Sequence, residues 1–128
     1  NWFPFISKEE ISFANYLFWN NSLDVKRVEG LTPVLRAHGI SRYDHVLSIP
    51  DHSFNVTLYL MDQKGYTVAR DHIMNDTTVM DRFMNKVDYI VLSDTTLKEQ
   101  IAFRRTEPLF ESHFTEGPVK VYKMKRAR

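Results

Sequence analysis

The chain contains no cysteine, almost no net charge and no long hydrophobic run. The lack of cysteine excludes a disulfide framework, a thiolate metal site and a cysteine nucleophile. Seventeen Lys and Arg residues balance 16 Asp and Glu residues, leaving a formal net charge of +1. This balance gives no broad basic surface, so we do not expect a nucleic-acid partner. No apolar run approaches the roughly 18 residues that a membrane span needs.

Glycine and histidine are too scattered to form the common nucleotide and metal motifs. The four glycines never form a G-x-G-x-x-G motif or a P-loop. The five histidines include no pair at the spacing of a helical metal site, and H-E-x-x-H is absent. We therefore expect neither a cofactor nor a metal ion.

The length and composition are those of one globular unit. The chain has 128 residues, of which 43% are hydrophobic and 26% are charged. These values predict a single domain over residues 1–128. The chain starts with "NWFPF" and not with methionine, so we interpret it as a piece of a longer protein or as a processed one.

Hydrophobic spacing and capping residues predict helices that alternate with strands. Predicted helices cover residues 11–21, 32–38, 54–64 and 75–86, and one more begins at Thr96. Predicted strands cover residues 46–49, 66–69, 87–92 and 117–124, with irregular structure after Pro108. We expect Gly65 to end the third of these helices.

This alternation is typical of parallel βαβ units. We therefore predict a three-layer α/β/α domain with a mostly parallel sheet of about four strands. The last strand is the one that we allow to be antiparallel at an edge, where its lysines would discourage further pairing.

Two acidic residues follow the strongest predicted strands. Asp51 comes after "VLSIP", and Asp94 comes after "VDYIVLS". Ligands in open parallel sheets bind beyond the carboxyl ends of the strands. If the two strands are neighbours, these carboxylates could share a crevice, where such a pair can bind a metal or a polyol, or raise the pKa of one carboxyl for acid–base work. The alternative is that each acid caps the helix that follows it.

Ser53 joins Asp51 and Asp94 as a candidate ligand-binding residue because it lies in the same loop as Asp51. Neighbouring Asp51, His52 and Ser53 do not make a hydrolase triad, since triad members are brought together by the fold. No G-x-S-x-G elbow is present. We assign no catalytic residue.

The stretch "LRAHGISRYDHVLSIPDHSFNVTLYLMDQKGYT", followed by "VDYIVLSD" and "VKVYKM", covers most of residues 30–124. This run of ordered pieces resembles the soluble C-terminal domain of some bacterial membrane glycosyltransferases. Those enzymes belong to the dolichyl-phosphate-mannose protein mannosyltransferase-like superfamily.

The resemblance implies a non-catalytic, extracytoplasmic accessory domain at the C-terminus of a longer membrane protein. The parent enzyme would transfer a sugar from a polyprenyl phosphate, with its catalytic acids in the membrane portion. The expected partners are that membrane-embedded remainder and a saccharide or glycan acceptor. The domain would lie on the periplasmic or extracellular side of the cytoplasmic membrane.

Two other functions stay open at this stage. One is a small stand-alone α/β hydrolase or phosphatase that uses Asp51. The other is a protein-interaction module that docks through the aromatic helix predicted over residues 11–21.

Overall fold

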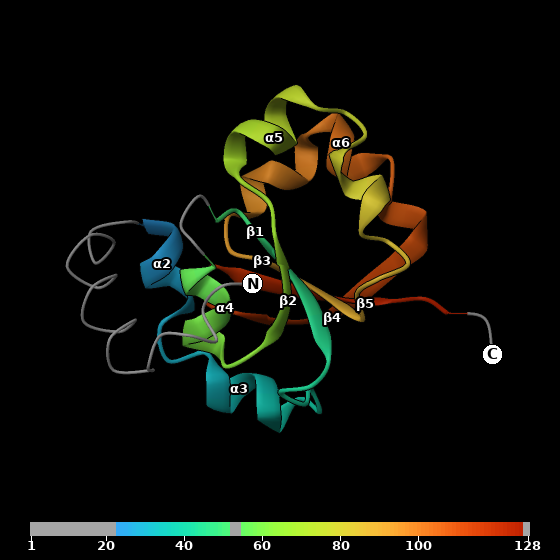
Figure 1. The fold of residues 1–128 in the computed structure, drawn as a ribbon. Coiled ribbons are helices and arrows are strands. Elements are labelled where there is room, and N and C mark those ends of the chain that lie inside the picture. The colour runs from blue at the N-terminus through green and yellow to red at the C-terminus, as the bar shows by residue number, and fades with distance from the viewer. Residues whose placement is uncertain (1–22, 52–54, 127–128) are drawn as a thin grey trace, which may run out of the picture.

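The structure, a computed structural model, describes residues 23–51 and 55–126. Within these ranges helices and strands alternate along the chain, with 3-10 helices labelled η (Figure 1). In chain order the elements are α2 (Leu23–Val28), α3 (Thr32–Ala37), β1 (His45–Ile49), α4 (Val56–Met61), β2 (Lys64–Thr67), α5 (Arg70–Asn75), η2 (Val79–Arg82), β3 (Tyr89–Leu92), η3 (Thr95–Glu99), α6 (Ile101–Arg104), η4 (Glu107–Leu109), β4 (Phe110–Glu116) and β5 (Val119–Met124). The helix predicted over residues 11–21 lies outside the described residues.

The strands of the described chain form a five-stranded sheet in the order β2-β1-β3-β5-β4. β1 pairs in parallel with β2 and with β3. β5 pairs antiparallel with β3 and with β4. The α/β class predicted from the alternating pattern is therefore confirmed, with a mixed sheet of five strands in place of about four.

The additional strand is β4, in a segment for which the sequence predicts irregular structure. Its side chains are mostly exposed or half-buried, and its register with β5 shifts between Ser112 and Phe114. A strand of this kind lacks the clean alternation of apolar and polar residues that identifies a half-buried strand. The turn to β5 contains Gly117 in the left-handed region, with a φ of +55°.

The last strand, β5, is antiparallel as allowed, but its predicted place at the edge is wrong. β4 occupies the edge, and β5 lies between β3 and β4. Lys120 and Lys123 of β5 therefore do not lie on an edge strand, where they would discourage pairing with another strand. They lie opposite Thr115 and Glu111 of β4, where Lys123 and Glu111 form a cross-strand pair of opposite charge.

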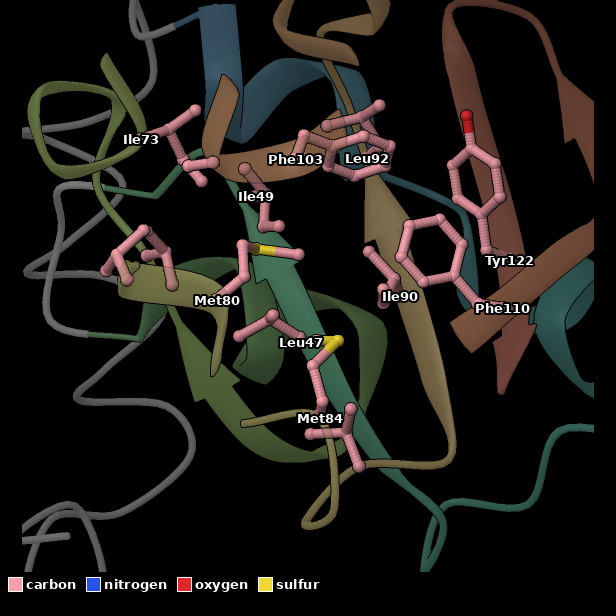
Figure 2. Close-up of a cluster of buried hydrophobic side chains, with 14 of the residues drawn as sticks. Leu47, Ile49, Ile73, Met80, Met84, Ile90, Leu92, Phe103, Phe110 and Tyr122 are labelled. Carbon is pink, nitrogen blue, oxygen red and sulfur yellow. The ribbon is translucent and has the colours of Figure 1, made fainter. Parts of the chain in front are cut away.

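Side chains of β1 and β3 alternate between two hydrophobic clusters, as expected for successive residues that point to opposite faces of a sheet. One cluster contains Leu47, Ile49, Ile90 and Leu92 (Figure 2), and the other contains Val46, Tyr89 and Val91. Residues of α5, η2, η3 and α6 join the first cluster, and residues of α2, α3 and α4 join the second. Residues of β5 contribute to both clusters. Burial on both faces explains why β3 is one nearly continuous apolar run.

The end of α4 differs from its prediction. α4 ends at Met61, and Asp62 follows in the left-handed conformation with a φ of 52°. Gly65 does not stop this helix but lies in β2. A Cβ atom on Gly65 would lie 1.9 Å from the carbonyl oxygen of Val46. Glycine is therefore required for the close approach of β2 to β1.

Two predicted helices are broken into shorter pieces. In place of one helix over residues 75–86, α5 ends at Asn75 and η2 begins at Val79. Asp76 accounts for part of this break, because its Oδ1 atom accepts hydrogen bonds from the backbone N–H and the hydroxyl of Thr78. The helix predicted from Thr96 is likewise divided between η3 and α6.

Candidate functional site

The candidate site lies at the carboxyl ends of the parallel strands. β1 and β3 are neighbours, with Ile49 opposite Leu92, so Asp51 and Asp94 follow the two strand ends at equivalent positions. After β1 the chain enters α4, which packs in one hydrophobic cluster, and after β3 it enters η3 and α6, which pack in the other (Figure 1). Adjacent strands whose connections diverge in this way form the switch point where ligands bind in open α/β sheets.

Asp51 is held inside the molecule by Val68, which directly follows β2, and by Thr57 of α4. Its backbone N–H donates to the carbonyl oxygen of Val68 at 3.0 Å, and the residue is only 3% exposed. Its Oδ2 atom accepts hydrogen bonds from the backbone N–H of Thr57 at 3.1 Å and from the Thr57 hydroxyl at 2.5 Å. The carboxylate thus satisfies an N–H of the first turn of α4, which is the role of a helix cap.

A second hydroxyl extends this buried network. The Ser48 Oγ and Thr57 Oγ1 atoms lie 2.8 Å apart, and both residues are buried. Because the Thr57 hydroxyl donates its hydrogen to Asp51, its oxygen accepts the hydrogen of Ser48. A charge-assisted network of this kind holds the carboxylate as an acceptor for the chain's own donors.

Asp94 also caps the element that follows it. Its Oδ1 atom accepts hydrogen bonds from the backbone N–H of Thr96 at 3.0 Å and from the Thr96 hydroxyl at 2.6 Å. Its Oδ2 atom accepts one from Arg70 Nη1 at 2.6 Å. Burial by itself would raise the pKa of this carboxyl, but the hydrogen bonds from Thr96 and Arg70 outweigh burial and lower the pKa from 3.8 to about 2.

Two arginines from different elements converge on Asp94. Arg70 is the first residue of α5, and Arg27 belongs to α2. Arg27 Nη1 lies 3.7 Å from Asp94 Oδ2, which makes an ion pair but is too long for a hydrogen bond. This nitrogen is buried and has no hydrogen-bond partner within residues 23–51 and 55–126.

The remaining predicted site residue, Ser53, lies outside the described residues. Next to that gap, Asn55 adopts the left-handed conformation with a φ of 62°. Its Oδ1 atom accepts a hydrogen bond from the Thr67 hydroxyl at 2.9 Å. This contact connects the start of α4 with Thr67, the last residue of β2, so polar side chains lie at the carboxyl ends of all three parallel strands.

The sequence-based prediction missed both arginines. Arg70 comes soon after the end of β2, so the rule that selected Asp51 and Asp94 could also have selected it. Arg27 carries no such signal. It lies on a short helix before the first strand, and only the folded chain brings it to Asp94.

The described residues contain no group of three His, Asp or Glu side chains arranged to hold a metal ion. In the same part of the chain, no helix combines the length and apolar character that crossing a membrane requires. Comparisons of the chain with protein-family models, with curated proteins and with solved structures found no match.

Proposed function

We propose that this chain is a non-catalytic accessory domain of a membrane glycosyltransferase that uses a polyprenyl-phosphate sugar. The observation that carries the non-catalytic part is the engagement of both candidate carboxylates. Asp51 is buried against Thr57, and Asp94 is paired with Arg70 and Thr96. A general acid at neutral pH needs a raised pKa, whereas the pKa of Asp94 is lowered to about 2.

The glycosyltransferase setting is supported by the sequence resemblance. The pieces that carry it coincide with the centre of the fold, because they include β1, α4, β2, β3 and β5. The proposal includes the predicted architecture, a three-layer α/β/α domain with helices on both faces of the sheet. The domain lies on the periplasmic or extracellular side, next to the membrane-embedded remainder of its parent.

Contact with a saccharide or glycan acceptor is the proposed role of the carboxyl edge of the parallel strands. Arg27, Arg70 and Asp94 present charged donors and acceptors there, with side chains between 14% and 38% exposed. Partly exposed charged groups of this kind can hydrogen-bond the hydroxyls of a sugar.

Chemical-shift mapping of the isotope-labelled chain with neutral mono- and oligosaccharides at millimolar concentration tests this role. The proposal predicts saturable shifts of backbone amides near residues 94–96 and of the Arg70 side chain. The variant Asp94→Ala should reduce them, and Asp81→Ala, which removes an exposed acid of η2, should not. Shifts absent from this edge would remove the acceptor contact and leave a structural role in the parent.

The phosphatase alternative makes a different prediction. An Asp51 nucleophile requires turnover of generic phosphoesters that disappears in Asp51→Asn while the circular dichroism of the fold persists. We expect no turnover by either protein, because the Asp51 carboxylate is buried and bonded to Thr57.

A further inference from the structure

Two arginines meet at the carboxylate of Asp94. Two guanidinium groups approach its single carboxylate, and both are nearest to the same oxygen, Oδ2. Arg70 donates a hydrogen bond to that oxygen at 2.6 Å, while Arg27 Nη1 stays at 3.7 Å. The other carboxylate at this edge, Asp51, is buried and accepts a hydrogen bond from the Thr57 hydroxyl.

The Nη1 atom of Arg27 is an unusual feature in a folded protein. Nearly all buried polar atoms have a hydrogen-bond partner, and an exception calls for an explanation such as a bound ion. This atom is buried and has no partner in the described chain, although the Arg27 side chain as a whole is 21% exposed. A guanidinium that is partly exposed and has an unsatisfied donor is suited to receive an acceptor from outside the chain.

The position and chemistry of the pair indicate the class of acceptor. Arg27 and Arg70 come from separate elements, α2 and α5, at the switch point between β1 and β3. Arginine favours phosphate because its planar set of donors matches the phosphate oxygens, and a charge-assisted hydrogen bond is stronger than a neutral one. We propose that Arg27 and Arg70 bind the phosphate group of a phosphate ester beside Asp94.

This inference rests on the proposed function for its setting, and it specifies the ligand of the same edge. The shared chemistry is a phosphate ester, which can belong to a soluble sugar phosphate or to a lipid headgroup. Asp94 then has two effects: it orients Arg70 through their hydrogen bond, and its negative charge weakens the attraction for the phosphate. The second effect distinguishes this site from a purely structural ion pair.

The test is a titration of the isotope-labelled 128-residue chain with inorganic phosphate, glucose 1-phosphate and glucose, observed by NMR. The variants are Arg27→Gln, Asp94→Asn and the control Arg42→Gln, which removes an exposed arginine paired with Asp62. Phosphate should give saturable shifts at Arg27 and Arg70. Arg27→Gln should weaken this binding about tenfold, the effect of one lost charge-assisted hydrogen bond.

Asp94→Asn should strengthen phosphate binding several-fold, because it removes a like charge while the amide oxygen can still cap Thr96. Arg42→Gln should leave the affinity unchanged. Circular dichroism of each variant establishes that it is folded, and the opposite signs expected for Arg27→Gln and Asp94→Asn keep the test independent of a general loss of stability.

Three results would overturn the inference: no saturable phosphate shift in the unmodified chain or in Asp94→Asn, weaker binding in Asp94→Asn, or an equal loss in Arg42→Gln. Binding of glucose with no preference for glucose 1-phosphate would also overturn it, while leaving the proposed acceptor contact intact. Phosphatidylcholine vesicles with and without phosphatidic acid then identify the source. Binding only to the phosphatidic acid vesicles supports a lipid headgroup, and binding only to glucose 1-phosphate supports a soluble ester.

Discussion

Arg70 Nη1 lies 2.6 Å from Asp94 Oδ2, while Asp94 Oδ1 accepts two hydrogen bonds from Thr96. Arg70 begins α5 after β2, and Asp94 precedes η3 after β3. This one carboxylate therefore joins two connections that leave different strands of the sheet. Asp51 acts similarly after β1, where it ties the strand end to α4 through Thr57.

Asp94→Asn should destabilise the chain by about 1 to 2 kcal/mol at neutral pH, because the folded-state pKa is about 2 against an ordinary value of 3.8. A lowered folded pKa means that the contribution is present in full above the unfolded pKa. It is then lost as the pH falls from about 4 towards 2. Urea unfolding at a series of pH values should show the difference between variant and parent shrinking over this range.

The matched control for that experiment is Asp76→Asn. Asp76 accepts the same pair of hydrogen bonds, from the N–H and hydroxyl of Thr78, but it lies on the surface and pairs with Arg82. We expect a smaller loss of stability. Equal losses in the two variants would show that the pairing of Asp94 with the arginines adds nothing.

Thr57→Val should cost about 2 kcal/mol or more. The substitution keeps the shape of the side chain but removes the hydroxyl that donates to Asp51 and accepts from Ser48. A buried carboxylate then loses a donor. Denaturant unfolding measures the loss, and the exposed Thr115→Val of β4 should change stability by less than about 0.5 kcal/mol. If Thr57→Val and Thr115→Val both changed the free energy of unfolding by a similarly small amount, the buried hydrogen-bond network would be contradicted.

Phe103→Ala should lower the free energy of unfolding by about 3 to 5 kcal/mol. Phe103 is fully buried on α6, and its ring contacts those of Phe110 and Tyr122 at centroid distances of 5.2 and 5.5 Å (Figure 2). Ile101 lies two positions earlier and is 63% exposed. Thermal unfolding should therefore show little change in melting temperature for Ile101→Ala. A larger loss of stability for Ile101→Ala than for Phe103→Ala would contradict the burial of the Phe103 face of α6.

Gly65→Ala should disrupt the pairing of β2 with β1, because the added Cβ would lie 1.9 Å from the Val46 carbonyl oxygen. We expect a loss of more than about 3 kcal/mol, or failure to fold. Gly30→Ala is the control: its φ of +73° is also left-handed, but no atom lies within 4 Å of the new Cβ. That variant should lose only about 1 kcal/mol. If Gly65→Ala and Gly30→Ala had similar soluble expression and similar melting temperatures, the close approach of β2 to β1 would be contradicted.

The strands that the sequence predicted are those whose burial leaves a strong local pattern. β1 and β3 are buried on both faces, so they appear as short apolar runs, and the α/β class follows from their alternation with helices. The sequence did not predict β4, because Phe110 is its only buried residue and a register shift interrupts the strand. It forms because β5 pairs with it, and such a contact between strands is not encoded in the local pattern of either one.

The sequence likewise predicted only those site residues that lie next to a recognisable strand. Asp51 and Asp94 were found because each follows a recognisable strand, and β1 and β3 are indeed neighbours. Arg27 was not, because its contact with Asp94 joins residues far apart in sequence. The prediction also left open whether the carboxylates cap or bind. Their hydrogen bonds to Thr57 and Thr96 show that both cap, and ligand binding by Asp51 or Asp94 stays a prediction.

The encoded sequence upstream of Asn1 tests the proposal that this domain is part of a membrane glycosyltransferase. A glycosyltransferase parent requires several hydrophobic spans there, each of about 18 residues or more. A short polar leader in their place would contradict it.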